Sequence, residues 1–266
     1  MTQQAIFITG GAGGIGLATA KLFRSHGWRV GIGDVDPAAL ARAASQVDVE
    51  TFEHDVRDYA AWEKVLDQFC GAEGALDVLV NNAGVLTFGF LDEQDPATFA
   101  NVVDINVKGV LFGSHAGVKR LARSDNGCLV NIGSSASLQA PPVLALYAAT
   151  KFAVRGLSEA LDVAYLRHGV RVACVEPFLV DTPMLDADDP NGRNYRVAVQ
   201  SQEVLSADDV AAAVWQAAHG GDFHYPVGDL PRRLVSELQD HFEAGRSQAR
   251  ANFAARRQPD ASPTKS

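Results

Sequence analysis

The chain has 266 residues, of which 47% are hydrophobic and 21% charged, so it can bury a large core and global disorder is excluded. Its 23 Lys and Arg against 32 Asp and Glu give a net charge of −9, which argues against a nucleic-acid or anionic-membrane partner. The three cysteines, Cys70, Cys128 and Cys174, form no Cys-x-x-Cys pair, which argues against a structural zinc site or a disulfide framework. No apolar run reaches the roughly 18 residues that span a bilayer, and no cleavable leader pattern is evident. We therefore expect a soluble cytoplasmic protein without a bound metal.

Short apolar runs alternate with helix-length segments along the chain. The runs lie at residues 5–8, 29–32, 47–49, 78–80, 129–132, 171–175 and 223–227. The longer segments between them are 14–26, 37–45, 59–70, 96–124 and 146–168. Strand and helix in regular succession predict an α/β fold, a doubly wound, Rossmann-like parallel sheet of seven strands with helices on both faces.

No linker, repeat or low-complexity tract divides the chain, so we expect one domain over residues 1–257 and a flexible tail at 258–266. Residues 183–205 interrupt the alternation of strand and helix, because they are polar and show no clear periodicity. Ser206 and Asp209 then predict a helix start with a variant of the capping box.

A glycine-rich segment follows the first predicted strand and opens a helix. It fits Gly-x-Gly-x-x-Gly at Gly11, Gly13 and Gly16, and also Thr-Gly-x-x-x-Gly-x-Gly at Gly10, Gly14 and Gly16. A dinucleotide pyrophosphate needs backbone N–H groups and a helix N-terminus, and side chains would block its approach. The position of the segment between strand and helix therefore predicts a dinucleotide-binding domain rather than an ordinary tight turn.

Asp34 ends the second predicted strand, 18 residues after Gly16. An acid at this place accepts hydrogen bonds from the adenosine ribose hydroxyls and repels a 2′-phosphate. No Lys or Arg lies in the glycine segment or directly after Asp34, so we predict NAD(H) rather than NADP(H). The alternative is that Asp34 and Asp36 only cap the helix that begins near Pro37, a role for which Asp36 is the better placed.

Tyr147 and Lys151 are four residues apart at the start of a long predicted helix, on one helix face. A phenol with a pKa near 10 is a poor base at neutral pH, and a neighbouring ammonium group lowers that pKa. The pair alone is a frequent accident of surface helices, but Ser134 follows the fifth strand 13 residues earlier. Its hydroxyl would lie at the ligand-binding edge of the sheet and reach a carbonyl or alkoxide oxygen. The alternative for this serine is a helix cap or turn, and Asn81–Gly84, after the fourth strand, would line the same edge or form an ordinary turn.

These motifs, in this order, resemble the short-chain dehydrogenase/reductase family in its single-domain form. The resemblance covers about residues 4–228 and rests on residues 9–16, Asp34, Asp55-Val56, residues 81–84, Asn106 within residues 104–109, Ser134, Tyr147 to Lys151, and Pro177 to Thr182. It implies an enzyme that moves a hydride between a nicotinamide and a secondary alcohol or ketone of moderate size.

The resemblance also implies roles for single residues. Tyr147 would be the general acid/base, Ser134 would hold the substrate oxygen, and Lys151 would lower the tyrosine pKa and bind the nicotinamide ribose. Asn106 would hold a water through its helix and so link Lys151 to solvent. The expected cofactor contacts are Gly10, Gly13, Gly14, Ile15, Gly16, Asp34, Asp55, Val56, Asn82, Ala83, Gly84, Tyr147, Lys151, Pro177, Val180 and Thr182.

Phe178 departs from the family pattern, which has glycine after Pro177. The backbone there must avoid torsions that only glycine adopts. We expect the Phe178 ring to narrow the substrate pocket, with a core position facing away from it as the alternative.

Residues 183–205 correspond to a loop that usually closes over substrate in the family, and we call them the substrate loop. We expect Phe178, Leu144 and Met184 to contact substrate, and Leu86, Phe88, Leu138 and Val143 to add apolar wall. The acids Asp186, Asp188 and Asp189 are interpreted as a solvated face rather than as ligands.

A stripe of Leu230, Leu234, Leu238 and Phe242 predicts a last helix that covers its own domain or packs on another subunit. The resemblance implies a tetramer or dimer built through the long helices after the fourth and fifth strands. Two other functions fit the fold, an NAD-retaining epimerase or dehydratase and a non-catalytic nucleotide-sensing protein. The glycine spacing and the length count against the first, and the intact Ser134, Tyr147 and Lys151 count against the second.

Overall fold

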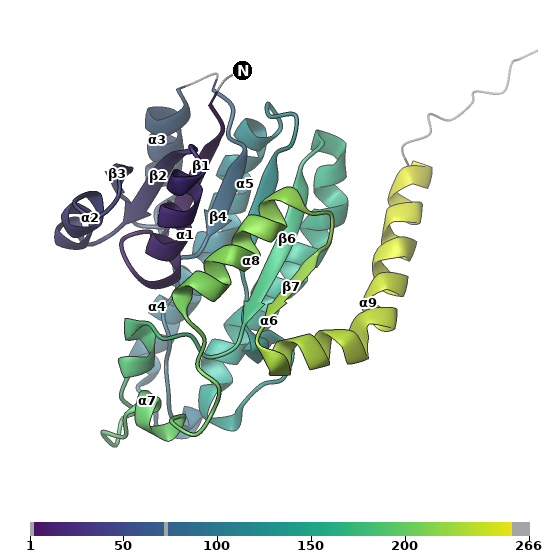
Figure 1. Cartoon of the computed structure of the whole chain (residues 1–266). Helices are drawn as coiled ribbons and strands as arrows, with labels where there is room; N and C mark the ends of the chain where they lie inside the picture. Colours follow the sequence, from purple (N-terminus) through teal and green to yellow (C-terminus); the bar gives the residue numbers. More distant parts are fainter. Residues whose placement is uncertain (1–2, 72–73, 257–266) are drawn as a thin grey trace, which may run out of the picture.

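Seven parallel strands form one sheet in the order β3-β2-β1-β4-β5-β6-β7 (Figure 1). The computed structural model describes residues 3–71 and 74–256, so the predicted tail at 258–266 lies outside the described residues. The strands are β1 (Ala5–Thr9), β2 (Arg29–Asp34), β3 (Glu50–Glu53), β4 (Val78–Asn81), β5 (Cys128–Ile132), β6 (Arg171–Pro177) and β7 (His224–Val227). The predicted doubly wound α/β fold is confirmed.

Helices cover both faces of the sheet (Figure 1). One layer holds α1 (Gly14–Ser25), α2 (Pro37–Ala44) and α8 (Ala207–His219), and the other holds α3 (Tyr59–Cys70), α5 (Gly109–Leu121) and α6 (Ala145–Ala164). Ile6 and Ile8 of β1 lie in the core with α1 and α8, whereas Phe7 lies in the core with α3. Because both faces of β1 are buried, its sequence is apolar without alternation.

The strand predicted at residues 47–49 is wrong, because β3 begins at Glu50. The Val47 N–H donates to the Ala43 carbonyl at 3.1 Å and so continues the end of α2. β3 is an edge strand that pairs only with β2 among the described strands, and Glu50, Thr51 and Glu53 are exposed. An exposed edge strand carries no apolar run for the sequence pattern to detect.

The long helix predicted at 96–124 is interrupted. It consists of a 3₁₀ turn (Pro96–Thr98), α4 (Phe99–Val103), a π-helical turn (Asp104–Lys108) and α5. The other predicted helices end within a few residues of the observed ones, and α6 runs on into a 3₁₀ turn (Tyr165–His168). Such π turns are frequent at functional sites, and this one carries Asn106.

The substrate loop has short structure of its own, a 3₁₀ turn (Pro183–Asp186) and α7 (Tyr195–Ala198). After it, Ser206 and Asp209 form the predicted capping box at the start of α8. The chain then enters α9 (Asp229–Arg256), which bends along its length and packs against α6 and β7 (Figure 1). The predicted last helix is present and covers part of its own domain through α6 and β7. The Phe242 side chain lies outside the described residues. No helix in the described part of the chain is long and apolar enough to cross a membrane.

Candidate active site

The carboxyl ends of β1, β2, β4, β5 and β6 open into one cavity of about 1690 Å³. Parallel α/β sheets bind ligands at this edge. Nearly every residue expected from the sequence lines it, namely Gly10, Gly13, Gly14, Ile15, Asp34, Asp55, Val56, Asn82, Ala83, Gly84, Ser134, Leu144, Tyr147, Lys151, Pro177, Phe178, Val180, Thr182 and Met184. Gly16 and Asn106 do not line the cavity, but each lies against the backbone of a residue that does.

The glycine loop fits a bound pyrophosphate. Gly10 and Gly14 have φ values of +60° and +49°, which side chains disfavour, and a Cβ on Gly16 would lie 2.2 Å from the Gly10 carbonyl oxygen. The backbone thus requires the Gly10, Gly14, Gly16 spacing. A Cβ on Gly13 would meet nothing within 4 Å, and Gly13 is the N-cap of α1 without a side-chain cap. The first N–H groups of α1 therefore face open cavity, as an anionic phosphate requires.

Asn82 joins the glycine loop to the end of β4. Its Nδ2 donates to the carbonyl oxygens of Thr9 at 2.9 Å and Gly10 at 3.1 Å. The Thr9 hydroxyl in turn accepts from the backbone N–H groups of Asn82 and Ala83, each at 3.1 Å. The Asn82 amide nitrogen is therefore bound to the glycine loop. The smaller residues Ala83 and Gly84 line the cavity beside it.

Asp34 and Asp36 have separate roles. The Asp36 carboxylate accepts from the N–H groups of Ala38 and Ala39 and caps α2. Asp34 does not cap that helix; its carboxylate accepts from Ala12 N–H at 3.3 Å and Asp36 N–H at 3.2 Å. These contacts hold the Asp34 carboxylate at the cavity wall, where β2 ends.

Asp55 and Val56 line the cavity beyond β3. The Arg57 guanidinium donates to both Asp55 carboxylate oxygens and holds the pKa of that carboxyl below its usual value. His54, which sequence reasoning missed, is 2% exposed, and its ring lies 4.5 Å from that of Trp62. Burial lowers the pKa of His54 to about 4, so the ring is neutral at pH 7.

Ser134, Tyr147 and Lys151 meet at one wall of the cavity. All three are buried, and the Ser134 hydroxyl is near enough to the Tyr147 phenol to lower its pKa. Ser134 also caps a 3₁₀ turn (Ser135–Ser137). It therefore fills the alternative role of a turn residue and also lies at the site. The Lys151 Nζ donates to the Ile132 carbonyl at 2.8 Å and lies 5.6 Å from the centre of the Tyr147 ring.

The lowering of the Tyr147 pKa by Lys151 stays a prediction. Burial raises the pKa of Tyr147 to about 12, and Ser134 offsets part of that rise. Burial also lowers the pKa of Lys151 to about 8. Loss of water disfavours the charged form of both groups.

Asn106 supports the site from behind. Its amide pairs with the backbone of Val85, accepting from N–H at 2.8 Å and donating to the carbonyl at 2.9 Å. Its Nδ2 also donates to the Thr150 hydroxyl at 3.1 Å, next to Lys151. Asn106 thus joins the π turn, the segment after β4 and helix α6.

The substrate side of the cavity is mostly apolar. Phe178, Leu144 and Met184 line it as expected, together with Leu86, Phe88 and Val143, whereas Leu138 does not. None of the described non-glycine residues has a positive φ, so Phe178 avoids glycine-only torsions as expected. The residues that sequence reasoning did not single out as walls are Leu179, Leu185, Tyr195 and Val199, which pack into the same cluster as Tyr147. The loop pattern gave no periodicity that would have marked them.

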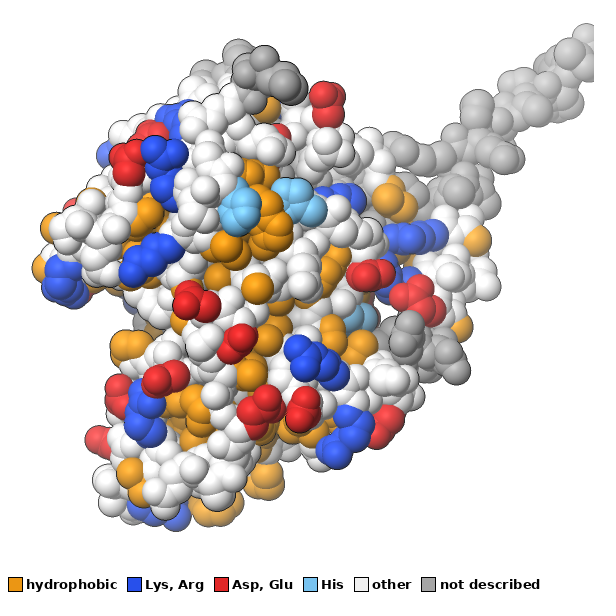
Figure 2. All heavy atoms as spheres, viewed as in Figure 1, with side chains coloured by type: hydrophobic (Ala, Val, Ile, Leu, Met, Phe, Trp, Pro, Cys, Tyr) orange, Lys and Arg blue, Asp and Glu red, His pale blue; other side chains and the backbone are white. Residues whose placement is uncertain are grey.

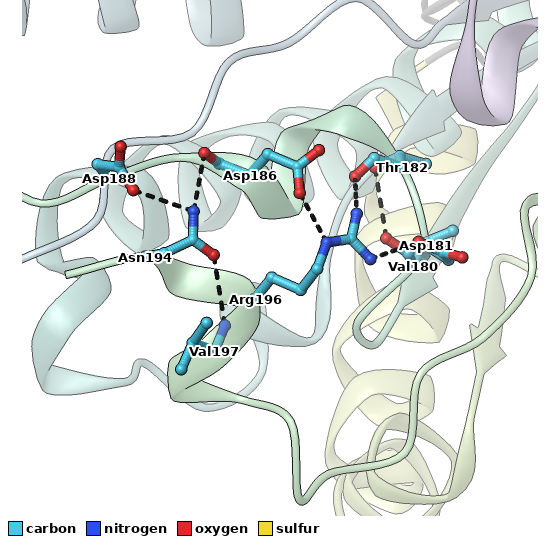
Figure 3. A network of polar contacts seen from close by, with 8 residues as sticks. All are labelled: Val180, Asp181, Thr182, Asp186, Asp188, Asn194, Arg196 and Val197. Carbon is cyan, nitrogen blue, oxygen red and sulfur yellow. Dashed lines mark hydrogen bonds and ion pairs between the residues drawn. The ribbon is translucent and has the colours of Figure 1, made fainter. Parts of the chain in front are cut away.

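Arg196 ties the substrate loop to the segment after β6 (Figure 3). Its guanidinium donates to the carboxylates of Asp181 and Asp186 and, at 3.1 Å, to the Thr182 carbonyl. Asn194 caps α7 through Val197 N–H and donates to the Asp186 carbonyl and the Asp188 carboxylate. We call these contacts the Arg196 network.

The interpretation of the loop acids as a solvated face is wrong for Asp189. Its side chain is fully buried and accepts from the N–H groups of Asn191 at 2.9 Å and Arg193 at 2.8 Å, and from the Arg193 guanidinium. A buried carboxylate persists only when it is paired in this way. Asp186 remains 58% exposed but is bound to Arg196.

Comparison with known proteins identifies the family of the chain. A family model described as short chain dehydrogenase matches residues 4–192. The chain belongs to the short-chain dehydrogenase family. Members of this family are nicotinamide-dependent oxidoreductases, and this chain is one that acts on CH–OH groups.

Several relatives align with about two thirds of the chain. A 3-alpha-(or 20-beta)-hydroxysteroid dehydrogenase of Mycobacterium tuberculosis is 36% identical over 185 residues, which cover 69% of this chain and 71% of that protein. An NADP-dependent (R)-specific alcohol dehydrogenase of Lentilactobacillus kefiri is 35% identical over 191 residues, covering 69% and 75%. A solved structure of ElxO with NADP bound has a TM-score of 0.73 at 24% identity, covers 85% of this chain and 97% of that chain, and supports the fold.

Proposed function

We propose that this short-chain dehydrogenase moves a hydride between NAD(H) and a secondary alcohol or ketone of moderate size. The observation that carries the proposal is the meeting of Ser134, Tyr147 and Lys151 at one wall of the cavity, beside the segment from Pro177 to Thr182. The nicotinamide, when bound, supplies or accepts the hydride. Tyr147 gives its phenol proton to the carbonyl oxygen during reduction and takes the hydroxyl proton during oxidation, while Ser134 holds that oxygen.

Tyr147 is protonated at neutral pH, as the acid in ketone reduction must be. Burial raises its pKa to about 12 and so makes it a weaker acid, and we expect Lys151 to lower that pKa when the cofactor is bound. Lys151 binds the nicotinamide ribose, and Asn106 holds the neighbouring backbone and links Lys151 to solvent through water. These roles follow from the family resemblance and from the positions of the three side chains.

NAD(H) is proposed over NADP(H) because of Asp34. Its carboxylate is held at the end of β2 by two backbone N–H groups, where a ribose 2′-phosphate would be repelled. The Lentilactobacillus kefiri relative and ElxO use or bind NADP, so family membership alone leaves this choice open. Arg57, the nearest cation in the sequence after Asp34 that lines the cavity, is bound to Asp55 and Asn101.

The substrate is proposed to be an uncharged small molecule, because the walls around Tyr147 are apolar. On the face drawn in Figure 2, Lys and Arg side chains are scattered among Asp and Glu and form no basic patch for nucleic acid. We also propose a cytoplasmic dimer or tetramer built through α5 and α6, where Leu111 and Phe152 are exposed.

The test is NADH formation across a panel of secondary alcohols, run in parallel with NADP. We expect oxidation with NAD to be preferred, and we expect Tyr147→Phe to lower kcat by about 10³-fold or more. Asp34→Ala should lower the NAD preference by about tenfold or more, since the ribose contacts are lost. Asp36→Asn is the matched control, because it removes a neighbouring charge but keeps a capping oxygen.

A preference for NADP in the unaltered protein would contradict the cofactor proposal. Activity that survives in Tyr147→Phe would contradict the mechanism. Cofactor binding without oxidation or reduction of any substrate would favour the nucleotide-sensing alternative, and a redox-neutral product would favour the epimerase or dehydratase.

A further inference from the structure

Tyr195 brings a second phenol into the substrate side of the cavity. It is the first residue of α7 and is 7% exposed. Its ring packs on Phe88 with the ring centres 4.7 Å apart, in the apolar cluster that also holds Leu144, Leu185 and Val199. Tyr195 also lines the cavity, so its phenol belongs to the wall that a bound substrate meets.

Tyr195 and Tyr147 line the same cavity and belong to the same apolar cluster. Burial raises the pKa of Tyr195, so its hydroxyl is neutral and can both donate and accept. Within residues 3–71 and 74–256, no residue forms a hydrogen bond with this hydroxyl.

The loop holds Tyr195 in place on both sides. Its backbone N–H donates to the Ala187 carbonyl at 2.9 Å, and Asn194 before it caps α7. Arg196 after it is bound to Asp181, Asp186 and Thr182 in the Arg196 network (Figure 3). The phenol is therefore positioned before substrate arrives, as a specificity contact must be.

An apolar substrate would cover this hydroxyl and remove its water without replacing the hydrogen bond. A substrate with a second oxygen would replace that bond. Sites with a hydroxyl placed in this way reject analogues that lack the partner oxygen far more strongly than they reject a change in apolar bulk.

We propose that Tyr195 is a specificity-determining residue that binds a second oxygen of the substrate, so that the preferred substrates are apolar compounds with a hydroxyl or carbonyl group besides the reacting one. The inference rests on the proposed function and names the substrate class of the same site. Tyr147 acts on the reacting oxygen, and Tyr195 contacts the other.

The test compares cyclohexanol with the 1,2-, 1,3- and 1,4-cyclohexanediols, using the full chain and NADH formation. These alcohols share one ring and differ in the second oxygen. We expect at least one diol to have a kcat/KM about tenfold or more above that of cyclohexanol. Tyr195→Phe keeps the ring that packs on Phe88, and should bring this ratio close to one while leaving cyclohexanol oxidation in place.

Tyr225→Phe is the matched control, because Tyr225 lies in the core with α8 and its hydroxyl is buried away from the cavity. It should leave the ratio unchanged. A ratio that is the same in Tyr195→Phe, or the absence of any diol preference in the unaltered protein, would overturn the inference while the proposed function stands. Failure to oxidise any alcohol would overturn both.

Discussion

At the residue scale, burial controls the protonation of the site. Tyr147, Lys151 and His54 each have a pKa shifted toward the neutral form, and burial is the largest cause for each. The sequence predicts that Lys151 lowers the pKa of Tyr147, and this stays a prediction, whereas the effect of burial on both groups could not be read from the sequence. Only the packing around α6 decides how much water each group loses.

His54 should make the stability of the protein depend on pH. Its folded-state pKa of about 4 lies below the ordinary 6.5, so the unfolded chain binds the proton more tightly. The stabilisation is fully present above pH 6.5 and is lost as the pH falls toward 4. We expect roughly 2 kcal/mol of the free energy of unfolding to be lost between pH 7 and pH 5 through this group.

Urea unfolding at the two pH values measures this loss. His54→Phe keeps an aromatic ring beside Trp62 and should show a smaller decrease than the unaltered protein. Exposed His115 is the control position, and His115→Gln should leave the decrease unchanged. An equal decrease in His54→Phe would show that other groups cause it.

Phe178 should limit the size of the substrate. Its side chain lines the cavity where the family has glycine, and its N–H donates to the Val227 carbonyl at 3.0 Å, so the backbone is fixed. We expect Phe178→Gly to raise kcat/KM for bulky ketones relative to small ones by about tenfold. Phe178→Leu, which keeps part of the bulk, should lie between the two, and an unchanged substrate profile in Phe178→Gly would contradict the role.

At the element scale, the substrate loop is the part that the sequence described least well. Its acids were interpreted as a solvated face, yet Asp189 is buried and the Arg196 network joins α7 to Asp181 and Thr182. Ion pairs between residues that are far apart in the loop leave no periodic signal. The π turn at Asp104–Lys108, which interrupts the predicted long helix, was also missed.

Arg196 should affect substrate binding more than protein stability. Arg196→Gln removes the charge that joins α7 to Thr182, so the wall carrying Tyr195 becomes less well positioned. We expect KM for the alcohol to rise about tenfold with a smaller change in kcat. Steady-state kinetics with saturating NAD measure both constants.

Arg29→Gln is the matched control for Arg196→Gln. Arg29 forms a two-pronged ion pair with Glu50 at the exposed edge of the sheet, away from the cavity. It should leave KM unchanged. Equal effects of the two substitutions on KM would argue against a specific role for the Arg196 network.

At the scale of the whole molecule, α9 is held to the domain by a buried ion cluster. The Asp162 carboxylate on α6 accepts from Arg246 at 3.0 Å and from Arg250 at 2.9 Å, and Arg246 also lies over the Phe223 ring. The side chains of Asp162 and Arg246 are only 7% and 10% exposed. Removing one member of such a pair lowers the free energy of unfolding, because the other charge stays buried without its partner.

Arg246→Met should therefore lower the free energy of unfolding by about 2 kcal/mol, less than a full loss because Arg250 remains. Urea unfolding measures the change, and faster tryptic cleavage within α9 should accompany it. On the same helix, Arg233→Met removes an exposed pair with Glu237 and should change stability by less than about 0.5 kcal/mol. Equal stability of the two variants would contradict the importance of the cluster.

From the sequence alone, the sheet apart from its edge strand β3, the glycine loop and the residues at the carboxyl edge of the sheet could be predicted. These features are local, since buried strands require apolar runs, the loop requires glycine torsions at Gly10 and Gly14, and Tyr147 and Lys151 share a helix face. The tertiary structure decided the edge strand β3, the separate roles of Asp34 and Asp36, the raised pKa of Tyr147 and the place of Tyr195 in the cavity wall. Each of these depends on which distant residues exclude water from a group or pair with it, and that is set by packing rather than by neighbours in the chain.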